Sequence, residues 1–112
     1  MPCDRVLAIA PFARVPYDQA FERAIGTCVL KLSTSELREL AESLDVNVHS
    51  PESLDRDAWL NVILAERVEP WMAKQGAVFL HDFPASQSAL ARVRDDDPPV
   101  AERFELYIGG VE

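Results

Sequence analysis

The chain has 112 residues and a mass of 12.5 kDa; 48% of its residues are hydrophobic and 27% are charged. A chain of this size makes one ordinary domain and is too short for a nucleotide-dependent enzyme with a separate binding module. Its 19 acidic residues outnumber its 11 basic residues, which gives a formal net charge of −8. Because this charge repels phosphate groups, the composition argues against nucleic acid or an anionic membrane as a partner of this segment.

Cysteine usage and the opening residues predict a cytoplasmic protein. Cys3 and Cys28 are the only cysteines, and neither belongs to a CxxC pair or to a cluster of metal ligands. Both are therefore expected to be reduced thiols. The apolar run over residues 6–10 ends at Pro11 and is too short for a signal peptide or a membrane-spanning helix.

Two helices are predicted after an extended or irregular lead-in over residues 1–15, which show no helical period. The first is expected over Tyr17–Ile25, because Pro16 suits a first helical turn and Gly26 suits the position after a last turn. In the second, Ser33 and Glu36 have the spacing of a capping box. Apolar residues then recur at positions 37, 40, 41 and 44, which is the spacing of one helix face.

A third and longer helix is predicted over residues 55–74 and ends at Gly76. Its apolar residues form a broad stripe along one face. Pro70 lies inside this span, where it removes a backbone hydrogen-bond donor. We therefore expect either a kink or a division of the helix into residues 55–68 and 70–74.

The remaining residues favour strands. Residues 77–80 form a continuous apolar run, which is typical of a buried strand, and this strand is expected to end at Pro84. Residues 85–93 are expected to form one or two helical turns. Residues 95–99 read as a loop whose three aspartates form a solvated acidic turn in preference to a metal site. From Val100 the chain alternates, with Phe104, Leu106 and Ile108 on one side of a half-buried strand. Helices followed by strands predict an α+β fold with a partial antiparallel sheet.

The C-terminal residues contain the most informative pattern. Gly109 and Gly110 follow an alternating strand and predict a tight hairpin turn that pairs Ile108 with Val111 and Tyr107 with Glu112. Arg103, Glu105 and Tyr107 then share one strand face, and Glu112 projects from the same face. The two glutamates would be diagonal neighbours with Cβ atoms about 7–8 Å apart, close enough to share a divalent cation. Arg103 could counterbalance their charge.

Other interpretations remain open at this point. A surface hairpin with scattered carboxylates explains the same alternation, and periodicity alone favours it. His81 and Asp82 with Ser86 or Ser88 could suggest a hydrolase triad, but the chain has no nucleophile-elbow motif. His49 has no second ligand at metal spacing and is expected to be structural or solvated.

Two segments resemble a known family. Residues 101–112 (AERFELYIGGVE) and residues 79–92 (FLHDFPASQSALAR) resemble the class II catalytic core of lysyl-tRNA synthetases. They are more similar to the shortened paralogues of those enzymes, the elongation factor P–(R)-β-lysine ligases. The resemblance implies that residues 1–112 form a single partial class II synthetase-like catalytic domain, with a helical part over about 16–75 and a strand part over about 77–112.

The resemblance also implies roles for matching positions. Glu105 would contact ATP and its Mg²⁺, Leu106 would lie at the same site, and Glu112 would contact the amino-acid substrate and share in metal binding. In this family, lysine or β-lysine is activated as an acyl-adenylate and then transferred to elongation factor P or to a tRNA hydroxyl.

The resemblance does not include class II motifs 1, 2 and 3, so we expect this chain alone to be catalytically inactive and assign no catalytic residue. The alternative is a non-catalytic helical interaction module derived from the same family. In either case, exposed apolar surface is expected to favour self-association.

Overall fold

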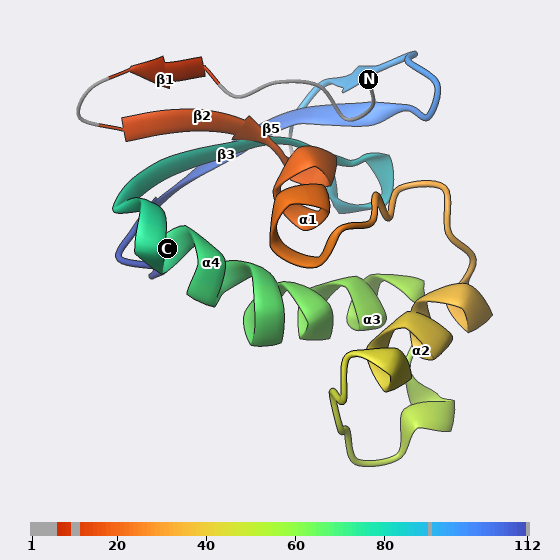
Figure 1. Ribbon diagram of the computed structural model, residues 1–112. Helices are drawn as coiled ribbons and strands as arrows, with labels where there is room; N and C mark the ends of the chain where they lie inside the picture. The colour runs from red at the N-terminus through yellow and green to blue at the C-terminus, as the bar shows by residue number, and fades with distance from the viewer. Residues whose placement is uncertain (1–6, 10–11, 90, 112) are drawn as a thin grey trace.

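In the computed structural model, the described residues are 7–9, 12–89 and 91–111, and the fold is a five-stranded sheet with helices on one face (Figure 1). The strand order is β1-β2-β3-β5-β4. The strands are β1 (Leu7–Ile9), β2 (Phe12–Pro16), β3 (Ala77–Pro84), β4 (Val93–Arg94) and β5 (Val100–Ile108).

The sheet is mixed. The pairs β1–β2, β3–β5 and β4–β5 are antiparallel, whereas β2 and β3 are parallel. A parallel pair needs a long crossover, and here all of the longer helices lie in that crossover between β2 and β3. The predicted α+β class is confirmed, but the sheet is not wholly antiparallel as expected.

Where the structure describes the predicted lead-in, at residues 7–9 and 12–15, it is extended and belongs to the sheet. Residues 12–16 form β2, with Arg14 opposite Phe79 and Val15 opposite Leu80 on β3. The expectation of reduced thiols is wrong at Cys28, which is disulfide-bonded, while Cys3 lies outside the described residues. No helix in the described ranges has the length and apolarity needed to cross a membrane.

The first two predicted helices are confirmed. Helix α1 (Tyr17–Ile25) ends at Gly26, whose φ of 83° is the left-handed conformation that glycine adopts readily. Helix α2 (Thr34–Ser43) begins with the predicted capping box: the Glu36 N–H donates to Ser33 Oγ at 3.2 Å, and the Ser33 N–H donates to Glu36 Oε1 at 2.8 Å.

The third predicted helix is interrupted before its proline, but by a π-helical turn and not by the expected division between residues 68 and 70. Helix α3 (Arg56–Ile63) continues through a π-helical turn, η2 (Leu64–Val68), into α4 (Glu69–Gln75). Asp55 caps its start by accepting the Ala58 N–H at 2.8 Å. Pro70 cannot donate a backbone hydrogen bond and its ring would clash with a carbonyl one turn earlier, so the wider π turn immediately before it relieves the conflict.

The segment after β3 is less helical than expected. Among the described residues of this segment, 85–89 and 91–93, only Ala85–Gln87 forms a helical turn, the 3₁₀ turn η3, and β4 begins at Val93. A second short 3₁₀ turn, η1 (Pro51–Ser53), lies between α2 and α3. In the acidic turn, Asp96 pairs with Arg94 at 3.1 Å and the highly exposed Asp97 with Lys31 at 3.8 Å. This is the solvated acidic turn that the sequence predicts.

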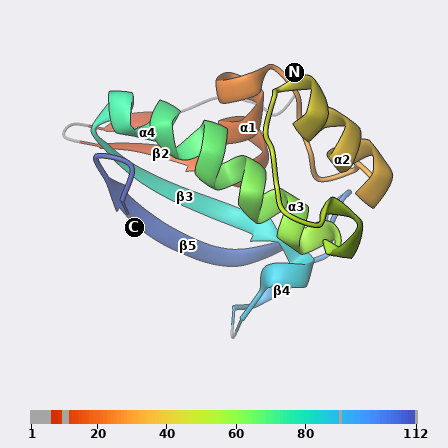
Figure 2. The same cartoon turned by 90° about the horizontal axis from the view of Figure 1, so that it is seen from below.

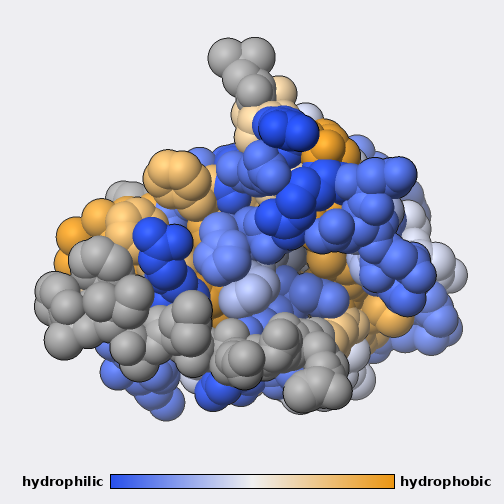
Figure 3. All heavy atoms as spheres, turned by 90° about the horizontal axis from the view of Figure 1, so that it is seen from above, coloured by the Kyte–Doolittle hydropathy of each residue, from blue (hydrophilic) through white to orange (hydrophobic). Residues whose placement is uncertain are grey.

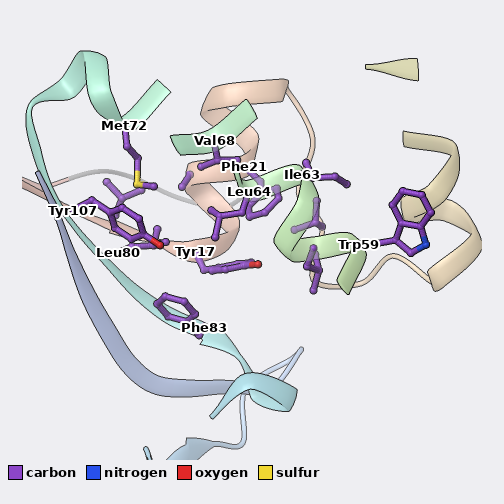
Figure 4. Packing of buried hydrophobic residues seen from close by; sticks show 14 of the residues in the cluster. Tyr17, Phe21, Trp59, Ile63, Leu64, Val68, Met72, Leu80, Phe83 and Tyr107 are labelled. Atoms are coloured by element: carbon purple, nitrogen blue, oxygen red, sulfur yellow. The ribbon is translucent and has the colours of Figure 1, made fainter. Parts of the chain in front are cut away.

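One hydrophobic core lies between the helices and one face of the sheet. Viewed from the helical side, α3 and α4 run along β3, and α1 lies beside them (Figure 2). The close view shows Met72 beside Tyr107, and Phe83 below the ring of Tyr17 (Figure 4). The largest fully buried side chains are Trp59, Tyr17, Phe21, Leu37, Leu60, Ile63, Met72, Leu80, Gln19, Val15, Val29 and Val68.

Arg56 anchors the connection between α1 and α2. Its Nε donates to the Leu32 carbonyl at 2.8 Å and its Nη2 to the Leu30 carbonyl at 2.5 Å. On the other side of the connection, Asp18 Oδ1 accepts the Val29 N–H at 2.6 Å. These charged groups satisfy backbone atoms of an irregular segment that has no ladder of its own.

We expect Arg56→Met to lower the free energy of unfolding by about 2–3 kcal/mol, because partly buried carbonyls lose a charged donor. Arg38→Met is the matched control: its exposed pair with Glu42, at 3.6 Å, should contribute no more than about 0.5 kcal/mol. Urea unfolding followed by circular dichroism measures both. Equal losses for the two variants would contradict the anchoring role of Arg56.

Candidate functional site

The two faces of β5 have opposite surroundings. Tyr107 is 3% exposed and lies opposite Val78 of β3, so its face of β5 is the one covered by helices. Phe104 and Ile108, on the other face, are 65% and 64% exposed. In a half-buried strand the apolar side normally faces the core, and here that side faces outward. The open side of the sheet is seen in Figure 3, where orange apolar atoms gather at one end beside blue polar ones.

Arg103 and Glu105 lie on the same face of β5 as Tyr107 and contact each other. Arg103 Nε donates to Glu105 Oε2 at 3.1 Å, and their side chains are 30% and 28% exposed. The prediction that Arg103 balances the charge of Glu105 is confirmed. This is a partly shielded ion pair rather than a fully solvated one, so its geometry is better defined than that of a surface pair.

Leu106 lies on the opposite face from Glu105. Its side chain is 37% exposed on the open side of the sheet, and it pairs with Phe79 of β3. Any contact of Leu106 with a ligand at Glu105 would therefore come from its main chain.

The predicted hairpin turn is confirmed. Ile108 and Val111 form an antiparallel bridge, in which the Ile108 N–H donates to the Val111 carbonyl at 2.9 Å. Gly109 and Gly110 both have positive φ, 62° and 83°, as the two central residues of a tight hairpin turn require. Glu112 lies outside the described residues. Its pairing with Tyr107 and its approach to Glu105 stay predictions.

The turn is seated on helix α4. The Gly109 N–H donates to the Gly76 carbonyl at 2.9 Å, just after the end of α4. A Cβ at Gly110 would lie 2.7 Å from the backbone oxygen of Glu69 and 3.0 Å from the Cβ of Ala73. Burial also raises the pKa of the carboxyl of Glu69, the first residue of α4, above its ordinary value. Glycine is thus needed at position 110 both for its conformation and for close contact.

A second set of contacts surrounds Arg103 and is not evident from the sequence. Its guanidinium lies over the ring of Phe83, 4.5 Å from the ring centre, and its Nη1 donates to the Gln87 carbonyl at 3.0 Å. Gln87 Nε2 and Ser86 Oγ reach Asp57 Oδ1 of α3 at 3.4 and 2.7 Å. The polar residues after Pro84 were the only sequence signal for this contact between the strands and α3.

The hydrolase alternative does not converge on one site. Ser86 donates to Asp57, whereas His81 Nδ1 lies 3.5 Å from Asp82 Oδ2, and Asp82 is held by Arg94 Nη2 at 2.8 Å. Burial raises the pKa of the nearby Tyr17 hydroxyl, and the electrostatic influence of Tyr107 and Asp57 raises it further. The Tyr17 hydroxyl is therefore neutral, and its side chain packs in the hydrophobic core.

In the ranges that the structure describes, no three His, Cys, Asp or Glu side chains are grouped closely enough to hold a metal ion. Glu105 is a partly exposed carboxylate, a suitable oxygen ligand for a hard cation such as Mg²⁺. Glu105 would supply one protein ligand. One carboxylate suits an Mg²⁺ ion that is also bound by nucleotide phosphates better than an ion bound only by protein groups.

Comparison with known proteins gives consistent relatives. An elongation factor P–(R)-β-lysine ligase of Vibrio vulnificus is 38% identical to this chain over 107 residues. The ligase of Salmonella arizonae is 39% identical over 108 residues, and that of Vibrio cholerae is 36% identical over 107 residues. Each match covers 96% of this chain. The chain spans about one third (33%) of the length of these relatives. No protein-family model matches the chain.

We expect Gly110→Ala to destabilise the C-terminal turn more than Gly109→Ala. Both pay about 1–2 kcal/mol for a left-handed non-glycine residue. Only Gly110→Ala places a Cβ against the Glu69 carbonyl, because nothing lies within 4 Å of a Cβ at Gly109. The added contact should cost roughly 1–3 kcal/mol more. Urea unfolding compares the stability of the two variants, and hydrogen exchange of the Ile108 amide reports on the turn. Equal destabilisation by the two substitutions would contradict the close packing of Gly110 against α4.

Proposed function

We propose that this chain, which matches elongation factor P–(R)-β-lysine ligases and spans about one third of their length, contributes part of an ATP-dependent site for activating lysine or β-lysine. The observation that carries the proposal is the match over 96% of the chain. The local geometry that supports it is the ion-paired carboxylate of Glu105 on β5, beside a confirmed glycine turn.

Glu105 is the residue that we assign to ATP and its Mg²⁺. A carboxylate oxygen suits the preference of Mg²⁺ for hard ligands, and the bound ion would offset the charge of the phosphates. Leu106 would contribute to the same site through its main chain. We assign Glu112 to the amino group of the substrate and to the same Mg²⁺, and this assignment rests on the family relationship.

The proposed reaction has two steps. A carboxylate oxygen of lysine or β-lysine attacks the α-phosphorus of ATP, so that an oxygen–phosphorus bond forms and pyrophosphate leaves. An acceptor amine of elongation factor P then attacks the carbonyl carbon of the adenylate, and AMP leaves. The part of Glu105 in this scheme is to bind and orient the nucleotide before the first step.

The proposal concerns a single partial catalytic domain over residues 1–112. The resemblance does not include class II motifs 1, 2 and 3, so we propose nucleotide binding without turnover for this chain alone. Lysine or β-lysine and elongation factor P are its proposed partners. Action on an elongation factor favours the cytoplasm, and the net charge of −8 disfavours direct contact with nucleic acid.

We predict that the chain binds ATP–Mg²⁺ with an affinity in the millimolar range and that Glu105→Gln weakens this binding at least about tenfold, or about 1.4 kcal/mol. The reason is that the neutral amide removes the anionic ligand while keeping the size of the side chain. Isothermal titration calorimetry, with and without Mg²⁺, measures the effect.

Glu102→Gln is the matched control, because Glu102 lies on the same strand, is 39% exposed and pairs weakly with Arg94 at 3.9 Å. It should bind ATP–Mg²⁺ as the unchanged chain does. Absence of saturable heat at millimolar nucleotide, or equal losses for both glutamine variants, would overturn the assignment of Glu105.

The open face of the sheet favours a second candidate role, as an interaction module. Phe104, Leu106, Ile108 and Val111 are 65%, 37%, 64% and 71% exposed, and Phe79 lies edge-on to Phe104 at 6.0 Å. Exposed apolar side chains grouped in this way usually mark a contact surface. The surface lies on strands rather than on the helices that the sequence suggested.

A second copy of the chain suits this surface. The Ile108 N–H points away from β3 toward Val111, and N–H groups alternate along a strand, so those of Leu106 and Phe104 point to the same edge. β4 pairs with β5 at Val100 and Ala101, and the Glu102 N–H donates to the Arg92 carbonyl at 2.6 Å, so this edge of β5 is covered as far as Glu102. An antiparallel β5–β5 contact centred on Phe104 would set Arg103 of each copy opposite Glu105 of the other, which is a complementary arrangement of charge.

We therefore predict a concentration-dependent dimer of roughly twice 12.5 kDa. Phe104→Lys should shift it to the monomer, whereas Val93→Lys, which alters a 47% exposed apolar residue away from this surface, should not. Sedimentation velocity over a range of concentrations measures both. A monomer at every concentration would contradict self-association, and dissociation by both variants would place the contact elsewhere.

A further inference from the structure

Three groups fix the orientation of the Arg103 guanidinium. Its Nε donates to Glu105, its Nη1 donates to the Gln87 carbonyl, and its Cζ lies over the ring of Phe83. Two donated hydrogen bonds in different directions and an aromatic contact restrict the rotamers of a side chain that is otherwise flexible. The guanidinium is therefore a defined part of the folded protein and not a mobile surface charge.

The groups that hold Arg103 are themselves anchored. Phe83 is 3% exposed and packs against Tyr17, with ring centres 5.1 Å apart (Figure 4). Gln87 is tied to the start of α3 through Asp57, which accepts hydrogen bonds from Gln87 Nε2 and from Ser86. Both the core and the helical layer thus contribute to the position of Arg103.

Arg103 acts in turn on Glu105. The two residues are two positions apart on one strand, and their side chains project from the same face. The 3.1 Å contact joins the Nε atom to one carboxylate oxygen, in a setting where both side chains are less than one third exposed. A charge-assisted hydrogen bond in partial shelter from water directs the carboxylate more strongly than an exposed pair would.

We infer that Arg103 is a positioning residue, which holds the carboxylate of Glu105 in the orientation that receives ATP–Mg²⁺. The inference rests on the proposed function of Glu105. Ordering of this side chain is completed during folding, so less conformational freedom is lost when the nucleotide binds. Asp57 and Gln87 contribute to the same ordering by holding Arg103.

A role through charge alone is the competing explanation, and lysine separates the two. Arg103→Lys keeps one positive charge but cannot reproduce the Nε bond, the second donor and the planar contact with Phe83 together. If only charge matters, lysine will preserve nucleotide affinity. If position matters, lysine and glutamine will both reduce it.

The first readout is the Mg²⁺-dependent binding of ATP to the full chain by calorimetry. We expect Arg103→Lys and Arg103→Gln each to weaken binding about tenfold, while the control Arg92→Lys, at an exposed arginine, leaves it unchanged. Unfolding midpoints recorded on the same samples identify losses that arise from stability. Full affinity in Arg103→Lys would overturn the positioning role.

The second readout does not need a nucleotide. Three-bond NMR couplings across χ1 of Glu105 should report one rotamer in the unchanged chain and averaging in both Arg103 variants. If the unchanged chain does not bind ATP–Mg²⁺, the proposed function fails, and the couplings still decide whether Arg103 orders Glu105. A single Glu105 rotamer retained in Arg103→Gln would overturn the inference whatever the calorimetry shows.

Discussion

Burial of one face of the sheet against the helices is the constraint on which the rest of the structure depends. On the side of α1, α3 and α4, the buried residues of this face include Val15 opposite Leu80 and Val78 opposite Tyr107. Burying one large apolar or aromatic side chain contributes about 1.5–3 kcal/mol, whereas an exposed ion pair contributes about 0–1 kcal/mol. Attraction between charges is therefore too small to decide which way β5 faces, and the side of β5 that the helices cover is the one with Ala101 and Tyr107.

The orientation of the candidate site follows from that choice. Successive residues of a strand alternate between its faces, so burial of Tyr107 places Glu105 and Arg103 on the helical side. The same alternation turns Phe104 and Ile108 outward, although both are apolar. Exposing these apolar side chains to water is unfavourable, and their exposure therefore makes the open face a candidate contact surface.

Features set by a few neighbouring residues could be predicted from the sequence. The first helix has the predicted bounds, the capping box of Ser33 and Glu36 forms both of its hydrogen bonds, and the glycine turn pairs Ile108 with Val111. Each depends on local backbone conformation and on side chains at most four positions apart. The contact of Arg103 with Glu105 belongs to the same class, because two residues separated by one position on a strand share a face.

Features set by distant pairing could not be predicted. β2 is parallel to β3 across a crossover of about sixty residues, and nothing in residues 12–16 specifies a partner so far along the chain. Alternation in β5 shows that the strand has two different faces, but which one is buried depends on the helices that cover it. The tie between Gln87 and Asp57 joins residues 30 positions apart, so it too depends on the folded arrangement.

The direction from which a ligand can reach Glu105 follows from its neighbours. Ala101 and Tyr107, on the same face, are 0% and 3% exposed, whereas the Glu105 side chain is 28% exposed. β4 pairs with the outer edge of β5 at Val100 and Ala101, and the Arg92 carbonyl accepts the Glu102 N–H at 2.6 Å, so this edge is covered up to the residue before Arg103. Solvent therefore meets the carboxylate along the outer edge of β5, between the helices and the open face. A molecule that approached along this edge would meet the Arg103–Glu105 ion pair, whose side chains are 30% and 28% exposed.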